Sequence, residues 1–124
     1  EAEEILGFEL NNLSDMKKGI NKFREKGISR VLLKGGHLKL KEKKIYDILL
    51  DNDNTFIFES MLIETLNTHG TGCSLASAVA SNLCLGYSLK ESVTKARNFI
   101  YKGIMNSIEI GNKHNPINHY YKLF

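Results

Sequence analysis

The chain has 124 residues, with 17 lysines and arginines against 14 aspartates and glutamates, so its formal charge is +3. This length allows one domain at most, and 42% hydrophobic residues suffice for a buried core, which excludes a wholly disordered chain. The small charge excess, interspersed with acidic residues, argues against a dedicated nucleic-acid binder. The cysteines Cys73 and Cys84 form neither a disulfide framework nor a zinc-type CxxC pair, so a reducing, cytoplasmic compartment fits best.

No stretch of the sequence approaches the roughly 20 apolar residues that a membrane span needs. Asn82 and several serines interrupt the longest candidate, residues 74–87. The chain opens with Glu-Ala-Glu-Glu and has no basic segment followed by an apolar one, so we expect no secretory signal. Since it also lacks an initiator methionine, we expect a processed chain or a piece of something longer.

Two helices are expected near the start of the chain. Residues 2–6 could form a short helix that Gly7 ends. A second helix is predicted over about 15–26, with Ser14 as its N-cap and Gly27 as its stop, because apolar residues recur there at helical spacing.

Strands are expected next. Residues 31–33 are a short continuous apolar run, which is typical of a strand buried on both faces. The β-prone runs 45–50 and 55–58 flank the turn-forming residues 51–54, so they predict an antiparallel hairpin or an added edge.

The second half of the sequence predicts two helices and a tail. Apolar residues four apart, interleaved with alanine and serine, follow Gly72, and these small residues would let a helix ending near Gly86 approach a sheet closely. The apolar positions of this helix are Leu75, Val79 and Leu83. Ser88 and Glu91 form a capping box, followed by apolar residues at helical spacing as far as Ile108. Residues 112–124 should form a loop.

The junction before the first of these helices carries the chemistry. Gly70 and Gly72 permit positive φ and close backbone approach, so N–H groups at a helix N-terminus could bind an anion there. A tight strand-to-helix turn explains the glycine pair equally well. Neither the P-loop nor the dinucleotide fingerprint is present. Cys73 falls in the first helical turn, where the helix field stabilises a thiolate and makes it a usable base or nucleophile.

The run Thr68-His69-Gly70-Thr71-Gly72-Cys73 resembles the anion-hole motif of the ribokinase-like kinases. It has the form found in the hydroxymethylpyrimidine and phosphomethylpyrimidine kinases of thiamine synthesis. The resemblance extends to residues 1–3, 31–37, 87–91 and 116–119, and so covers nearly the whole chain in order. It implies a three-layer α/β sandwich with a mainly parallel sheet, of which residues 1–124 match only the C-terminal portion.

The resemblance also implies a reaction. ATP would phosphorylate the hydroxymethyl group of 4-amino-5-hydroxymethyl-2-methylpyrimidine, and then of its monophosphate. Cys73 would be the catalytic base, and the backbone at Gly70, Thr71 and Gly72 would stabilise the transferring phosphate. Cys84 is interpreted as a small buried helix residue. The pyrimidine pocket belongs mostly to the missing N-terminal half, so we expect a longer protein, a homodimer, or this piece paired with that half.

Other residues take roles by the same resemblance. Lys34, at a strand end, would neutralise ATP phosphates, and Gly36 would let the chain pass near the nucleotide. Thr68 would either hydrogen-bond the nucleotide or cap its turn. Glu1 matches the glutamate of an Asn-x-x-Glu motif that helps to order Mg²⁺.

Several basic residues remain open. His37 and His69 could hydrogen-bond phosphate or act as local caps. His69 and Cys73 are spaced like a metal pair, but no third ligand follows at useful spacing. The following lysines form a solvated hairpin face or touch phosphate: Lys39, Lys41, Lys43 and Lys44.

Three other functions are compatible with these residues. A pyridoxal kinase of the same branch has a similar cysteine motif, and its ring-contacting residues would lie upstream. A non-catalytic nucleotide-binding module would keep the anion hole without an acceptor pocket. A purely structural α/β fragment would bind no nucleotide.

Overall fold

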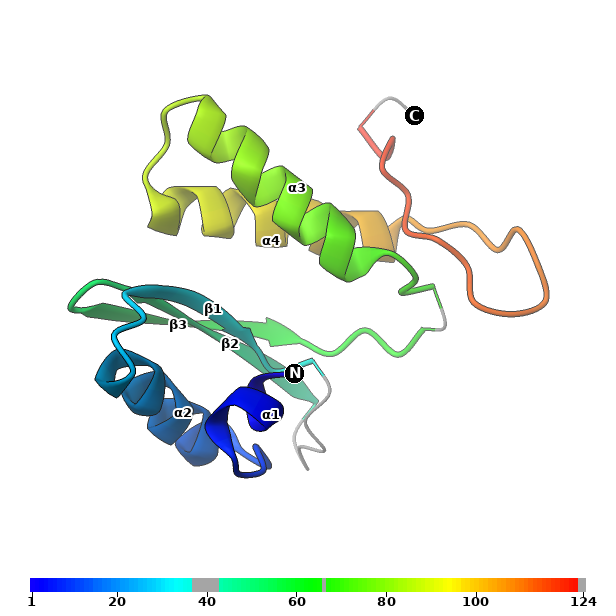
Figure 1. Ribbon diagram of the computed structural model, residues 1–124. Coiled ribbons are helices and arrows are strands. Elements are labelled where there is room, and N and C mark those ends of the chain that lie inside the picture. Colours follow the sequence, from blue (N-terminus) through cyan, green and yellow to red (C-terminus); the bar gives the residue numbers. More distant parts are fainter. Residues whose placement is uncertain (37–42, 66, 123–124) are drawn as a thin grey trace. The chain divides into compact units, whose positions relative to one another are not determined.

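The computed structural model describes residues 1–36, 43–65 and 67–122. The chain divides into two compact units, Glu1–Leu62 and Ile63–Phe124. The first unit contains two helices and three strands, and the second contains two helices and the C-terminal tail (Figure 1).

The two helices predicted for the first unit are present. Helix α1 spans Ala2–Leu6 and is followed by Gly7 in the left-handed conformation, with φ of 79°. Helix α2 spans Leu13–Glu25, and Gly27, with φ of 80°, follows it as predicted. The start of α2 lies two residues earlier than expected.

The predicted N-cap of α2 is wrong. Asn12 caps the helix, because its extended backbone lets its Oδ1 accept a hydrogen bond of 2.9 Å from the backbone N–H of Asp15. The Asp15 carboxylate in turn accepts from the N–H of Asn11 at 3.1 Å. Ser14 is instead the second residue of the helix. Asparagine and serine are about equally good N-caps, and the two hydrogen bonds that Asp15 forms with Asn12 and Asn11 favour a helix start at Asn12.

The three strands of the first unit form one antiparallel sheet. Strands β1 (Arg30–Lys34), β2 (Lys44–Asp51) and β3 (Asn54–Met61) lie in that order. The predicted hairpin is therefore confirmed as β2 and β3, with Asn52 at φ of 54° in its turn. Asparagine tolerates this left-handed region better than most residues.

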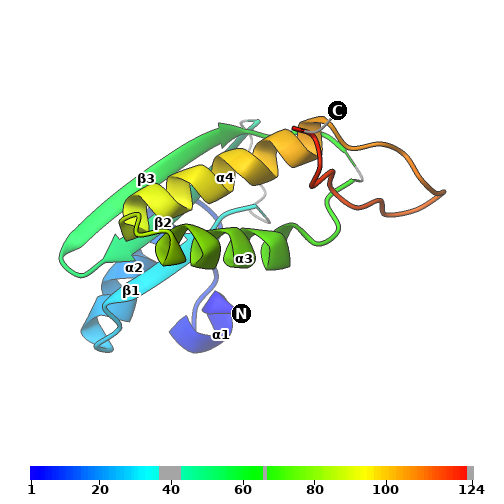
Figure 2. The same ribbon diagram turned by 90° about the horizontal axis from the view of Figure 1, so that it is seen from above.

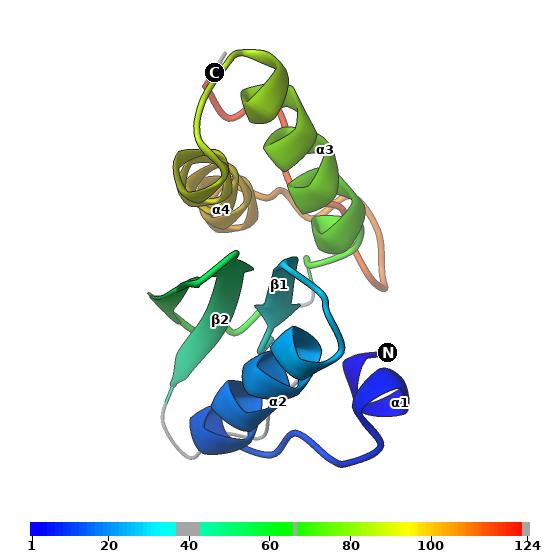
Figure 3. The same ribbon diagram turned by 60° about the vertical axis from the view of Figure 1, so that its left-hand side comes forward.

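Helix α2 packs against one face of the sheet (Figure 3). Of the apolar run predicted as a strand buried on both faces, Leu33 is buried, whereas Val31 and Leu32 are half-buried. The core of the unit consists of apolar side chains from α1, α2 and the sheet: Leu6, Leu10, Met16, Ile20, Phe23, Leu33, Ile48 and Leu50.

Gly35, directly after β1, is required by packing. A Cβ atom there would collide with the carbonyl oxygen of Tyr46 and lie 3.2 Å from the sulfur of Met16. We expect Gly35→Ala to lower the free energy of unfolding by about 2 kcal/mol, because buried backbone must shift. Gly36→Ala is the matched control, since nothing lies within 4 Å of its Cβ position. Urea unfolding measures both, and equal losses would contradict this account.

In the second unit, helices α3 (Thr71–Cys84) and α4 (Leu89–Met105) lie side by side (Figures 1 and 2). Leu75 is the buried residue of α3, whereas Leu83 is 43% exposed, so the predicted apolar stripe is buried only at its start. The buried positions of α4 are Ser92, Val93, Ala96, Ile100 and Gly103.

Side chains form hydrogen bonds at both ends of α4. The predicted capping box is confirmed, with the N–H of Glu91 bound to Ser88 Oγ and the N–H of Ser88 bound to the Glu91 carboxylate. The predicted continuation to Ile108 is wrong, because the helix ends at Met105 and Ile108 is 67% exposed. At the C-terminal end, the Lys102 carbonyl accepts two hydrogen bonds from Asn106, one from its backbone N–H at 3.0 Å and one from its side-chain amide at 2.8 Å.

The capping box gives a pH-dependent prediction. Hydrogen bonds from the Ser88 side chain and backbone N–H lower the pKa of Glu91 below its ordinary 4.5. Its stabilising contribution is therefore complete above pH 4.5 and lost as the pH falls through the lowered pKa. We expect wild type and Glu91→Gln to converge in unfolding free energy on acidification. Ser88→Ala should cost about 1 kcal/mol at neutral pH. Thermal unfolding across pH tests both, and a constant gap for Glu91→Gln would contradict the assignment.

Among the helices of the described residues, none combines the length and apolar character needed to cross a membrane.

Candidate active site

The start of α3 is set by Gly70. This residue occupies the N-cap position with φ of 81°, a left-handed conformation that glycine adopts without strain. Cys73 is the third residue of the helix and is exposed, so its predicted place in the first turn is confirmed. Of the two glycines that permit positive φ, only Gly70 adopts it, because Gly72 is already the second helical residue.

The first turn of α3 presents backbone donors. The N–H of Thr71 bonds to the Thr68 carbonyl at 3.4 Å, and the N–H of Ser74 bonds to the Gly70 carbonyl at 3.0 Å. Between them, the N–H groups of Gly72 and Cys73 precede the first intrahelical partner. Because the N-cap is a glycine, no side-chain cap covers them. These N–H groups can donate hydrogen bonds to an anion, and the positive end of the helix dipole would add to its binding.

The C-terminal tail holds the loop that leads into α3. The N–H of His69 bonds to the Asn115 carbonyl at 3.3 Å, and His69 and Pro116 form a parallel bridge. The buried Asn67 donates a hydrogen bond of 3.0 Å to the hydroxyl of Ser107. Segments about 40 residues apart in sequence therefore fix the loop, which sequence patterns did not reveal.

A groove of 780 Å³ opens within the second unit. Helix α3, helix α4 and the tail all contribute side chains to it. Cys73 lines the groove, as do three lysines, Lys95, Lys102 and Lys122. The groove therefore places the candidate base, Cys73, among positively charged side chains. Lysine ammonium groups attract phosphate.

Sequence reasoning missed Ser74 and His119. Ser74 Oγ lies 2.8 Å from Nε2 of His119, and both residues line the groove beside Cys73. The His119 ring lies 6.2 Å from that of Phe99, which in turn lies 5.8 Å from Tyr121. The only sequence signal was the resemblance of residues 116–119 to the kinases, which gave no role to any of them.

The other predicted residues of this unit have simpler surroundings. Thr68 and His69 are exposed in the loop before Gly70. The prediction that Cys84 is buried is wrong, because it is exposed at the last position of α3. It does not line the groove.

The remaining predicted residues belong to the first unit. Lys34 is the exposed last residue of β1, and Gly36 is exposed two positions later. Between them, the N–H of Gly35 bonds to the buried Asp47 carboxylate at 3.1 Å, which fixes the turn after the strand. Lys44 forms an ion pair of 2.9 Å with Glu59. Lys43 is exposed, just before β2, whereas His37, Lys39 and Lys41 lie outside the described residues.

Glu1 is exposed and precedes α1. Within the described ranges, no three histidine, cysteine, aspartate or glutamate side chains are grouped so as to hold a metal ion.

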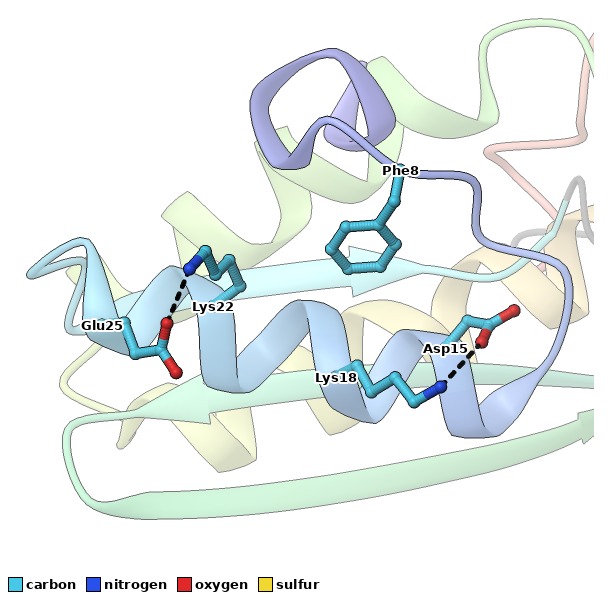
Figure 4. A pocket seen from close by; sticks show the side chains of 5 residues that line it. All are labelled: Phe8, Asp15, Lys18, Lys22 and Glu25. Atoms are coloured by element: carbon cyan, nitrogen blue, oxygen red, sulfur yellow. Dashed lines mark hydrogen bonds and ion pairs between the residues drawn. The ribbon is translucent and has the colours of Figure 1, made fainter.

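A hollow of 440 Å³ lies on the first unit between Phe8 and α2 (Figure 4). Its charges are paired, with Lys22 2.9 Å from Glu25 and Lys18 3.7 Å from Asp15. Exposed pairs of this kind are solvated and leave little net charge for a ligand.

Solved structures define the class of the protein. The chain matches *Bacillus subtilis* pyridoxal kinase, solved as an ADP complex, with a TM-score of 0.87 and 32% identity, covering 100% of this chain and 46% of that one. The chain therefore has a portion of the ribokinase-like α/β fold, as predicted from its sequence.

The family follows from the sequence comparisons. The model of the phosphomethylpyrimidine kinase family matches residues 1–118, and the chain belongs to this family. It is 33% identical over 120 residues to hydroxymethylpyrimidine/phosphomethylpyrimidine kinase of *Bacillus subtilis*, covering 97% of this chain and 44% of the relative. It is 34% identical over 120 residues to pyridoxine kinase of the same organism, covering 96% and 44%. The chain thus spans less than half the length of these relatives.

Gly70 and Gly86 form a matched pair for testing the junction. Both have positive φ, 81° and 89°, and a Cβ on either would meet nothing within 4 Å. We expect alanine at either position to lower the free energy of unfolding by about 1 kcal/mol, because of the left-handed backbone. Only Gly70→Ala should also weaken binding of an ATP analogue, measured by calorimetry, because only Gly70 sets the first turn of α3. Equal binding by both variants would contradict the assignment.

Proposed function

We propose that the protein transfers the γ-phosphoryl group of ATP to the hydroxymethyl group of 4-amino-5-hydroxymethyl-2-methylpyrimidine and of its monophosphate, in thiamine biosynthesis. The observation that carries the proposal is the place of Cys73 in the uncapped first turn of α3, lining a groove with three lysines. Family membership supplies the reaction class. The acceptor is inferred from the relatives named for it.

Cys73 acts as the general base in this proposal. Its thiolate accepts the proton of the substrate hydroxyl as the oxygen attacks phosphorus, and ADP leaves. Phosphoryl transfer demands positioning and charge stabilisation more than covalent chemistry from the protein. The N–H groups of Gly72 and Cys73, together with the turn at Gly70 and Thr71, stabilise the negative charge on the transferring group.

Other residues bind the nucleotide in this proposal. Lys34 neutralises phosphate charge, Gly36 gives the nucleotide close access to the backbone, and Thr68 contacts it from the loop. Mg²⁺ is commonly held by one or two carboxylates together with phosphate oxygens and water, so a single carboxylate at Glu1 fits a shared site. Such an ion would neutralise phosphate charge.

The proposal also covers the organisation of the protein. Residues 1–124 form the C-terminal, ATP-binding part of one ribokinase-like domain, and an N-terminal half supplies most of the pyrimidine pocket. A homodimer, or pairing with that half, completes the enzyme in the cytoplasm. Neither a nucleic acid nor a membrane is a partner in it.

Pyridoxal phosphorylation is the second candidate. The similarity to pyridoxine kinase and to solved pyridoxal kinases favours it. The same base and anion site would serve either acceptor, so only the acceptor pocket distinguishes the two candidates.

Cys73 and Cys84 offer a matched test, because both are exposed cysteines on α3 and only Cys73 lines the groove. We expect Cys73→Ala to lower kcat by about 10²-fold or more, the loss typical of a positioned base. Cys84→Ala should leave it unchanged. The assay is ADP release by the natural-length protein with ATP and Mg²⁺, offered the pyrimidine, its monophosphate or pyridoxal.

Each outcome of the assay selects a function. Turnover with the pyrimidines supports the proposal, and turnover with pyridoxal alone moves the assignment to the second candidate. No turnover from a folded protein that binds ATP indicates a nucleotide-binding module, and loss of ATP binding as well indicates a structural fragment.

A further inference from the structure

We propose that His119 is a positioning residue for the Cys73 end of α3, acting through its hydrogen bond to Ser74. This inference rests on the proposed function for its kinetic consequences. It assigns to the C-terminal tail a part in setting the geometry of phosphoryl transfer.

The hydrogen bond joins two segments far apart in sequence. Ser74 Oγ lies 2.8 Å from His119 Nε2, across 45 residues. Ser74 directly follows Cys73, and its own N–H makes the first intrahelical bond to Gly70. A hydrogen bond that fixes the Ser74 side chain therefore also constrains the turn that contains Cys73 and the N–H donors.

The tail is itself anchored on both sides of His119. The N–H of Asn118 bonds to the Gly103 carbonyl at 3.0 Å, and the Ile117 side chain is buried. The His119 ring packs near Phe99 of α4, which also contacts Tyr121. The exposed imidazole thus has a ring of α4 on one side and the Ser74 hydroxyl of α3 at its Nε2, so it connects the two helices.

This geometry points to an effect on turnover more than on nucleotide affinity. The turn at Ser74 orients the N–H donors and the thiolate, which act on the transition state. Loss of an interaction that is made only in the transition state lowers kcat and kcat/KM together. A side chain that merely stabilised the tail would change unfolding without that kinetic signature.

The test uses single, double and conservative variants of the natural-length protein. We expect His119→Ala and Ser74→Ala each to lower kcat about fivefold, the scale of one hydrogen bond. The double variant should be no slower than the slower single variant, because both remove the same interaction. His119→Gln should restore turnover, since its Nε2 reaches nearly the same point, whereas His119→Asn should not. His114→Ala is the matched control, because His114 is exposed in the same tail and lies outside the groove.

A second measurement is independent of kinase activity. In a Cys84→Ala background, the rate at which iodoacetamide modifies Cys73 reports on the first turn of α3. We expect His119→Ala and Ser74→Ala to change this rate about twofold or more, and His119→Gln to restore it. If the wild type turns over no acceptor, the proposed function fails, and the alkylation rates alone decide the role of His119. Additive kinetic losses, no rescue by glutamine, or unchanged kinetics and alkylation would each overturn the inference.

Discussion

The candidate site depends on one backbone conformation, the left-handed Gly70 at the start of α3. Because glycine brings no side chain to the N-cap position, the donors of the first turn face outward instead of being satisfied within the chain. Helix α4 shows the opposite arrangement, since its capping box binds the N–H groups of Ser88 and Glu91 within the chain. The start of α4 is therefore stabilised by its own side chains, whereas the start of α3 leaves backbone donors available to a ligand.

That conformation is maintained by contacts that come from the far end of the chain. Asn115 accepts the N–H of His69 with its carbonyl and the N–H groups of Ile110 and Gly111 with its side chain. It thereby folds the segment after α4 and ties it to the loop before α3. Buried asparagines are costly unless their polar atoms are bonded, so these contacts specify one arrangement of the loop. The same tail contributes His119, Tyr121 and Lys122 to the lining of the groove beside Cys73.

In the first unit, a glycine and a buried carboxylate fix the turn that follows β1. Gly35 lets the chain turn directly against β2, and Asp47 binds the freed N–H group. Lys34 is thereby presented at the end of a strand whose neighbours are packed on α2. Gly35, which has no room for a side chain, directly follows Lys34, to which the proposal gives a phosphate-binding role. Gly70, which brings no capping side chain, directly precedes the turn whose N–H groups would bind phosphate.

The sequence by itself determined the elements, the capping box of α4, the place of Cys73 in a first helical turn, and the family. These features depend on residues close in sequence, whose spacing and local hydrogen bonding are readable directly. The predictions for Ser14, Cys84 and Ile108 were wrong, because two local solutions compete there or because burial depends on distant neighbours. Only the tertiary structure decided that Asn67, Asn115 and His119 hold the start of α3, because their partners lie roughly 40 residues or more away and no local periodicity encodes such contacts.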